Sequence, residues 1–132
     1  MHIAGINWLA VLVAAAAFFA IGLVIHMKLV DLKAWDAAKH TDQAKLSKAR
    51  MAFGMILPLA TATGLAILFS WGNVAGVAEG VKWGLVVALA SGLPVLWYNW
   101  FYGTSPLWIF AVDSAHQLIG HAAVGAILAG WR

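Results

Sequence analysis

Charged residues gather in one short band of this chain, from Lys28 to Arg50. The band holds six of the eight Lys and Arg residues and three of the five acids of a 132-residue chain. Hydrophobic residues make up 64% of the sequence and charged residues only 10%, whereas soluble domains carry about 25% charged residues. The remaining residues cannot form the surface of a soluble domain. The sequence therefore predicts an integral membrane protein.

Four apolar runs lie on either side of this band. A membrane-spanning helix needs about 20 mostly apolar residues, and runs of that length cover residues 7–27, 51–71, 83–102 and 107–131. The short connections after the second and third runs favour antiparallel neighbours. The expected fold is all-α, with residues 1–132 forming one membrane domain built as an antiparallel, up-down four-helix bundle.

The band also predicts the orientation of the protein, because Lys and Arg are retained on the cytoplasmic side during insertion. With residues 28–50 as a charged cytoplasmic hairpin, both termini lie outside, together with only Lys82 and Arg132 of the basic residues. Tryptophan favours the headgroup level of a bilayer, and it stands at nearly every expected span end. We therefore expect a multi-pass protein of the bacterial inner membrane, and a first helix that runs on unbroken to Ala38.

Small residues recur every four positions from just before the third run into its first half, at Gly80, Gly84, Ala88 and Gly92. This spacing lines one face of a helix and lets a second helix approach closely in lipid. We expect these four residues to pack against another helix. The glycines before them allow two interpretations: the third helix begins near Gly76, or Gly72 and Gly76 belong to a flexible link.

Polar residues inside the spans are few, and each needs a partner because a central charge costs about 2.5–3.5 kcal/mol on the insertion scale. The predicted topology brings several of them to the cytoplasmic half of the membrane. His26 ends the first span, Asn99 lies near the end of the third, and the others share one face of the fourth. The candidate buried polar cluster consists of His26, Asn99, Asp113, His116, Gln117 and His121.

Three interpretations of this cluster stay open. The polar groups can satisfy one another and fix helix packing, or they can form a proton or solute pathway through His and a buried carboxylate. In the third, His26, His116 or His121 ligates a metal or a tetrapyrrole such as haem or chlorin, with room left beside Gly22 and Gly120. The sequence contains no recognisable hydrolase, zinc-protease or phosphate-binding motif, so we expect no enzyme.

Both ends of the chain carry motifs of a known family. The stretch Asn7–Ala15, the Lys33-Ala34-Trp35 triplet, the Asp113–His116 stretch and Val124–Leu128 resemble the domain of unknown function 1761 family of small bacterial membrane proteins. The resemblance implies a four-helix membrane protein with no established activity, and it places a family histidine at His116. Where the family tends to have Trp-Tyr-Ser-Pro after the glycine of its first helix, this chain has Ile25–Lys28, which favours an unbroken helix.

Function is therefore expected to be that of an accessory or scaffold subunit of a membrane complex. The alternatives are a small proton-coupled, transporter-like protein and a tetrapyrrole- or metal-binding subunit that uses a buried histidine. The expected partners are the lipid bilayer and either a larger membrane complex or further copies of the chain. Nucleic acid is not expected, because the basic residues are mixed with acids at the membrane surface.

Overall fold

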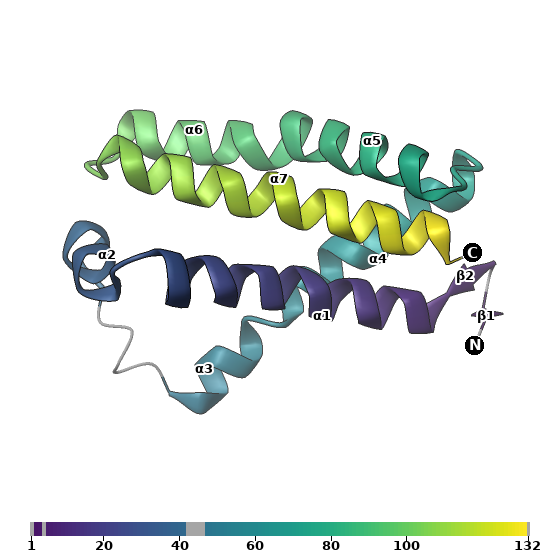
Figure 1. The fold of residues 1–132 in the computed structure, drawn as a ribbon, viewed down its shortest axis with the longest axis horizontal. Coiled ribbons are helices and arrows are strands. Elements are labelled where there is room, and N and C mark those ends of the chain that lie inside the picture. The colour runs from purple at the N-terminus through teal and green to yellow at the C-terminus, as the bar shows by residue number, and fades with distance from the viewer. Residues whose placement is uncertain (1, 4, 42–46, 132) are drawn as a thin grey trace.

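The computed structural model describes residues 2–3, 5–41 and 47–131, and this part of the chain is almost entirely helical (Figure 1). The expected all-α class is confirmed. One small element departs from it, a hairpin in which strand β1 (His2–Ile3) pairs antiparallel with strand β2 (Ile6–Asn7). Gly5 supplies the turn of this hairpin with a φ of 75°, a conformation that costs glycine little.

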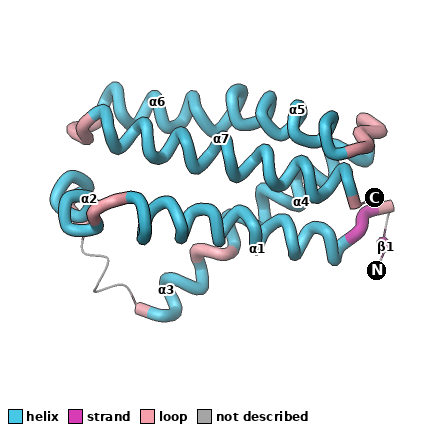
Figure 2. The backbone as a smooth tube through the Cα atoms, in the orientation of Figure 1, coloured by secondary structure: helices cyan, strands magenta, loops and turns pink. Residues whose placement is uncertain are grey.

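The helices follow one another along the chain with short connections (Figure 2). They are α1 (Trp8–Val24), the π-helical turn η1 (Ile25–Leu29), α2 (Leu32–Lys39), α3 (Lys48–Phe53), α4 (Ile56–Trp71), α5 (Val77–Val87), the π-helical turn η3 (Ala88–Gly92), α6 (Leu93–Tyr102) and α7 (Leu107–Gly130).

Helix α7 is the centre of the packing. It lies between α1 and the α5–α6 pair and also contacts α4 (Figure 1). Val11 of α1, Leu65 of α4 and Val124 of α7 are almost fully buried in the shared apolar core. The side chain of Asn7 accepts a hydrogen bond from the Ala10 amide and donates one to the Trp131 carbonyl, so the start of α1 lies beside the end of α7.

The backbones of α5 and α7 touch each other through glycine. A Cβ atom added to Gly80 would meet the carbonyl oxygen of Gly125, and one added to Gly125 would meet the carbonyl oxygen of Gly80. A Cβ atom added to Gly84 would meet the carbonyl oxygen of His121. The small residues at these positions therefore permit the close approach of the two helices.

The third apolar run forms a helix that begins earlier than residue 83, the start expected from hydropathy. Helix α5 begins at Val77, after Gly76 with a φ of 88°, so the interpretation that starts the helix near Gly76 is the one observed. The run then continues to Tyr102 through the π-helical turn η3, in which the Leu93 amide donates to the Ala88 carbonyl. This wider turn accommodates Pro94, which has no amide hydrogen to donate.

The expectation of an unbroken first helix is wrong. The helix ends at Leu29, because Val30 is extended with a φ of −120° and a ψ of 138°. Asp31 then caps a new helix by accepting hydrogen bonds from the amides of Lys33 and Ala34. The second run is also divided, since α3 ends at Phe53 and α4 begins only at Ile56, not at residue 51.

Within the described part of the chain, two helices are long and apolar enough to cross a membrane, Trp8–Leu29 with 22 residues and Val77–Tyr102 with 26. Helix α4 has only 16 residues. Helix α7 has 24 residues but carries the polar residues of the candidate cluster. Large apolar side chains are exposed along the outer faces of α1, α4 and α6, for example Leu12, Leu57 and Phe101.

Candidate functional site

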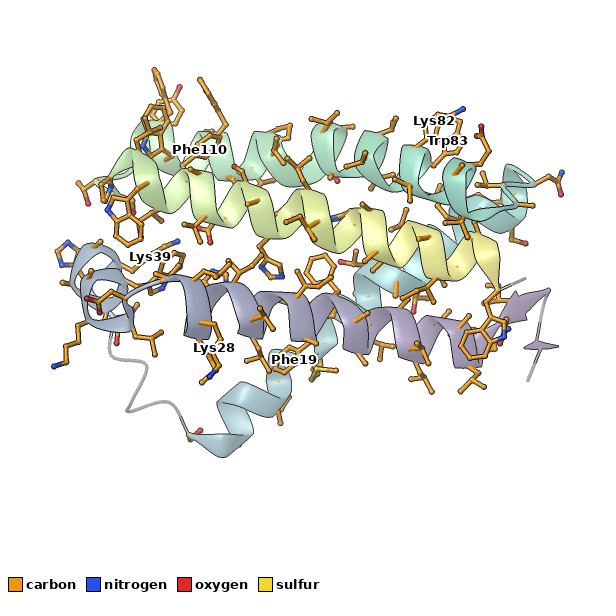
Figure 3. The ribbon with its side chains drawn as sticks, viewed as in Figure 1. Phe19, Lys28, Lys39, Lys82, Trp83 and Phe110 are labelled. Carbon is orange, nitrogen blue, oxygen red and sulfur yellow. The ribbon has the colours of Figure 1, made fainter. Side chains whose placement is uncertain are left out.

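Asp113 of α7 is held between two basic side chains. Its Oδ2 atom accepts a hydrogen bond from Lys39 Nζ at 2.9 Å, and its Oδ1 atom lies 3.4 Å from Nε2 of His26. Lys39 extends from α2 into the space between α1 and α7 (Figure 3). The carboxylate side chain is 17% exposed, so the Lys39 ammonium is its direct counter-charge in a partly buried place.

Helix α2 folds back over this site. Its Trp35 is only 7% exposed and packs edge-on against the His26 ring, with the ring centroids 4.7 Å apart. The Lys39 ammonium lies 4.9 Å from the centroid of the Trp35 ring, within the range of a cation–π interaction. Part of the charged band therefore contributes a buried ring and a cation to the site.

The surroundings of His26 contain acceptors on both sides of its ring. Nδ1 lies 2.8 Å from the Gly22 carbonyl oxygen, and Nε2 faces the Asp113 carboxylate. Neither oxygen can donate a hydrogen bond. An imidazolium therefore satisfies both contacts by donating two hydrogen bonds, whereas a neutral imidazole leaves one contact unmade. The π-helical turn η1 contains His26, and such turns are frequent at functional sites.

His116 continues the site along α1 and α7, away from α2. Its ring centroid lies 5.4 Å from that of His26, and its Nε2 atom is 3.4 Å from the Phe18 carbonyl oxygen. The Phe18 ring packs against His116 and also against His121, with centroid distances of 4.9 and 5.4 Å. His121 is buried, and its Nδ1 atom donates to the Gln117 carbonyl oxygen. An apolar ring thus lies against both histidines.

The structure brings together three of the six residues predicted for the cluster, namely His26, Asp113 and His116. Asn99 is exposed on α6 and makes no side-chain hydrogen bond with these three residues. Lys39, Trp35 and Phe18 belong to the site but were missed from the sequence. One signal bears on Lys39: the apolar runs contain a single acid, Asp113, and no Lys or Arg, so any Lys or Arg partner of Asp113 comes from outside them.

Protein rings lie where side chains would start at Gly22 and Gly120. A Cβ atom on Gly22 would lie 2.7 Å from the His116 ring, and one on Gly120 would lie 2.7 Å from the Phe18 ring. These contacts leave no room for a flat macrocycle at the Cβ positions of the two glycines, although Gly22 also lines the groove described below. Among the described residues, no group of three His, Cys, Asp or Glu side chains is placed to hold a metal ion.

A groove of about 750 Å³ opens beside this site, between the second half of α1, helix α2 and the start of α4. Its walls are mostly apolar and include Phe19, Leu23 and Leu57. The polar residues that line it are His26, Lys33, Asp36, Thr61, His116 and Gln117. Figure 3 shows Phe19 on the side of α1 that faces α4. The volume lies in the usual range for small-molecule sites, about 300–1,000 Å³.

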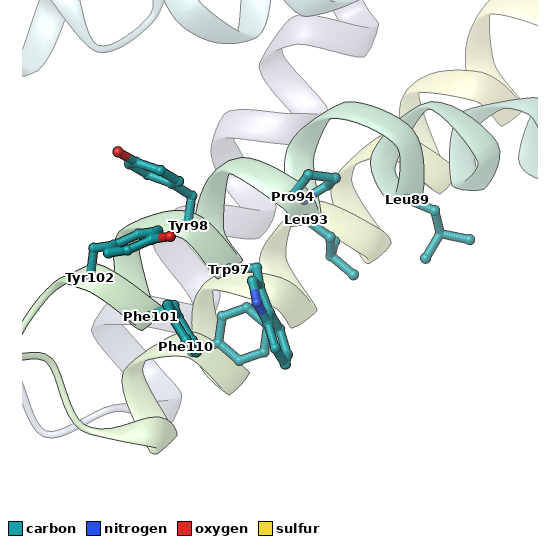
Figure 4. A pocket seen from close by; sticks show the side chains of 8 residues that line it. All are labelled: Leu89, Leu93, Pro94, Trp97, Tyr98, Phe101, Tyr102 and Phe110. Atoms are coloured by element: carbon teal, nitrogen blue, oxygen red, sulfur yellow. The ribbon is translucent and has the colours of Figure 1, made fainter.

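A second hollow of about 690 Å³ lies on the outer face of α6, far more open and lined mainly by aromatic rings (Figure 4). The rings of Tyr98 and Tyr102 pack there at a tilt of 49° with centroids 4.7 Å apart, and the Trp97 and Phe110 ring centroids are 5.7 Å apart. Indole and phenol rings favour the headgroup level of a bilayer. This aromatic face lies at the same end of the molecule as α2 (Figure 1).

The sequence model of a protein family described as "Protein of unknown function (DUF1761)" matches residues 9–129, which is nearly the whole chain. No curated protein and no solved structure shows a significant match.

Proposed function

We propose that this chain, which belongs to the DUF1761 family of proteins of unknown function, is a small, non-enzymatic, proton-binding membrane protein. It spans the bacterial inner membrane four times, through α1, α4, α5–α6 and α7. Residues 28–50 lie in the cytoplasm and both termini lie outside. Two long apolar helices and the exposed apolar side chains on the outer faces support a membrane placement, and the basic band supports the orientation.

One observation carries the proposed function: both ring nitrogens of His26 face oxygen acceptors. Binding a proton at His26 completes two hydrogen bonds and places an imidazolium beside the Asp113 carboxylate. Losing that proton breaks one of these hydrogen bonds and leaves Lys39 as the remaining cation on Asp113. Proton occupancy is thereby coupled to the contacts that hold α1, α2 and α7 together.

The groove gives protons access to this site. His26 and His116 both line it, and the His26 side chain is 24% exposed. Toward the other side of the membrane, the Phe18 ring lies between the ring contacts of His116 and His121. We place the cytoplasmic entry at the groove and the barrier at Phe18, so a full crossing requires that Phe18 move.

Proton flux into liposomes tests this proposal. In Asp113→Asn the amide can donate to a neutral His26, so the proton is no longer needed there and we expect flux to fall at least tenfold. Glu79→Gln is the matched control, because Glu79 is 51% exposed and pairs with Lys82 near the other end of the molecule. Liposomes free of fatty acids exclude protonophoric leakage. Undiminished flux in Asp113→Asn would refute a proton pathway through this site.

The aromatic face of α6 favours a second candidate function, that of an accessory or scaffold subunit. Tyr98, Phe101 and Tyr102 are each more than half exposed, and large aromatic side chains are enriched where membrane and protein partners meet. An apolar transmembrane helix of a larger complex would cover this face. We expect co-purification of such a complex after mild detergent extraction, and a monodisperse monomer without partners would contradict this second candidate.

A further inference from the structure

We infer that the groove between α1 and α4 binds a single-chain amphiphile with a carboxyl head, of the long-chain fatty acid class. The inference rests on the proposed function, since it names the solute that shares the groove with the proton site. It follows from three features of the groove: walls that are apolar yet uncovered, an amide in its polar part without a partner, and a lysine at its rim.

The walls require an apolar occupant. Near its N-terminus α1 packs directly on α4, where Ala14, Ala62 and Leu65 are buried. Farther along, the helices no longer cover each other: Met27 of η1 is 57% exposed and Leu57 of α4 is 73% exposed, although both line the groove. A hydrocarbon chain lying between them would remove these side chains from any water that enters the groove.

The polar side chains of the groove require an occupant that can form hydrogen bonds. Gln117 lines the groove from α7, and its side-chain amide makes no hydrogen bond to any of the described residues. Thr61 of α4 lines the same groove, and its hydroxyl likewise has no partner in the described part of the chain. Unsatisfied polar groups are costly at membrane depth. An occupant made only of hydrocarbon would leave both groups without partners.

A carboxyl group is the best hydrogen-bond partner for these polar side chains. A Cβ atom added to Gly92 of η3 would lie 3.2 Å from the Gln117 amide oxygen, so this oxygen lies toward η3 and the amide NH₂ group is left to donate to the carbonyl oxygen of a carboxyl group. The neutral acid is also the form favoured where water is scarce. An ionised acid arriving from the cytoplasm meets Lys33, which is exposed at the rim and whose ammonium has no partner among the described residues.

A phospholipid fits this arrangement less well than a fatty acid. Its phosphate stays at the headgroup level, whereas Gln117 lies between His116 and His121 along the apolar length of α7. Its second chain would also have to share a groove of about 750 Å³, whose lining includes His26 and Trp35. The inference therefore commits to a single chain with a small terminal head.

Trp35 reports on the occupancy of the groove, because it lines the groove and is itself buried. The probe is dodecanoic acid with bromine on its chain, a quencher of tryptophan fluorescence, added to the purified full-length protein in nanodiscs. The Trp35→Phe protein gives the signal of the other seven tryptophans. Bromododecanol, with the same chain and no carboxyl group, tests the role of the head, and a brominated phosphatidylglycerol tests ordinary lipid.

We expect saturable quenching of Trp35 by the acid and at least tenfold weaker binding of the alcohol. Gln117→Leu should weaken binding of the acid about tenfold, as for the loss of a hydrogen bond worth about 1.4 kcal/mol. Asn99→Leu, the same kind of change at an exposed amide on α6, should leave it unchanged. Native mass spectrometry should count one dodecanoate per chain in the unsubstituted protein, independently of fluorescence.

Equal binding of acid and alcohol, equal quenching by phosphatidylglycerol, or equal effects of Gln117→Leu and Asn99→Leu would each overturn the inference. Binding is measured without a pH gradient, and proton flux is measured without fatty acid. Flux that depends on Asp113 without dodecanoate binding therefore overturns only the groove inference. Dodecanoate binding without Asp113-dependent flux overturns the proposed proton function and leaves the groove site standing.

Discussion

Replacing Gly125 by leucine is expected to lower the free energy of unfolding by more than about 3 kcal/mol. A Cβ atom at this position would meet the carbonyl oxygen of Gly80 in the facing helix. Overpacking in a core typically costs about 1–3 kcal/mol when side chains can move aside. Here the obstacle is backbone, so α5 and α7 must separate along the contact that joins Gly80 and Gly84 to α7.

Thermal unfolding in a mild detergent, followed by far-ultraviolet circular dichroism, measures this loss. Gly64→Leu is the matched control, because Gly64 lies exposed on α4 and a Cβ atom there meets nothing within 4 Å. We expect this control to unfold at the temperature of the unsubstituted protein or slightly above it, since glycine is a poor helix former. Equal unfolding temperatures for the two leucine variants would contradict the backbone contact.

The sequence predicted the helical class and the family because both depend on local properties. Run length and hydropathy mark apolar helices whatever surrounds them, and the end motifs identify the family, which the match to residues 9–129 confirms. The spacing of Gly80 and Gly84 placed them on one helix face, and both contact α7 in the structure. Four membrane crossings and their orientation remain predictions.

The candidate site was harder to predict because it depends on how helices face one another. Charge placement gave the depth of Asn99 but not its direction around the bundle, and the side chain faces outward on α6. The residues from Lys28 to Ala38 include no proline or glycine, so nothing in their propensity marked the break at Val30. Asp31 before Leu32-Lys33-Ala34 was a readable capping signal. The contact between Lys39 at the end of this helix and Asp113 depends on tertiary packing, which a capping signal does not predict.

The ion pair between Lys39 and Asp113 gives a second prediction with a large effect. Removing one partner of a fully buried pair costs about 3–5 kcal/mol because the other charge is left alone. The Lys39 side chain is 32% exposed and can turn toward water. We therefore expect Asp113→Asn and Lys39→Met each to lower the free energy of unfolding by about 1–3 kcal/mol. Lys82→Met, at a surface pair whose lysine is 60% exposed, should have almost no effect.

The double variant distinguishes a direct interaction between Lys39 and Asp113 from two independent losses of stability. If Lys39 is the counter-charge of Asp113, then Asp113→Asn with Lys39→Met should be less destabilised than the sum of the single variants, by about 0.5–3 kcal/mol. Additive losses would mean that α2 docks through Trp35 alone. A coupling that persists at high salt would indicate a pair shielded from solvent, as its position under α2 requires. The charged band would then contribute to helix packing, since one of its lysines neutralises the acid on which the proposed proton site depends.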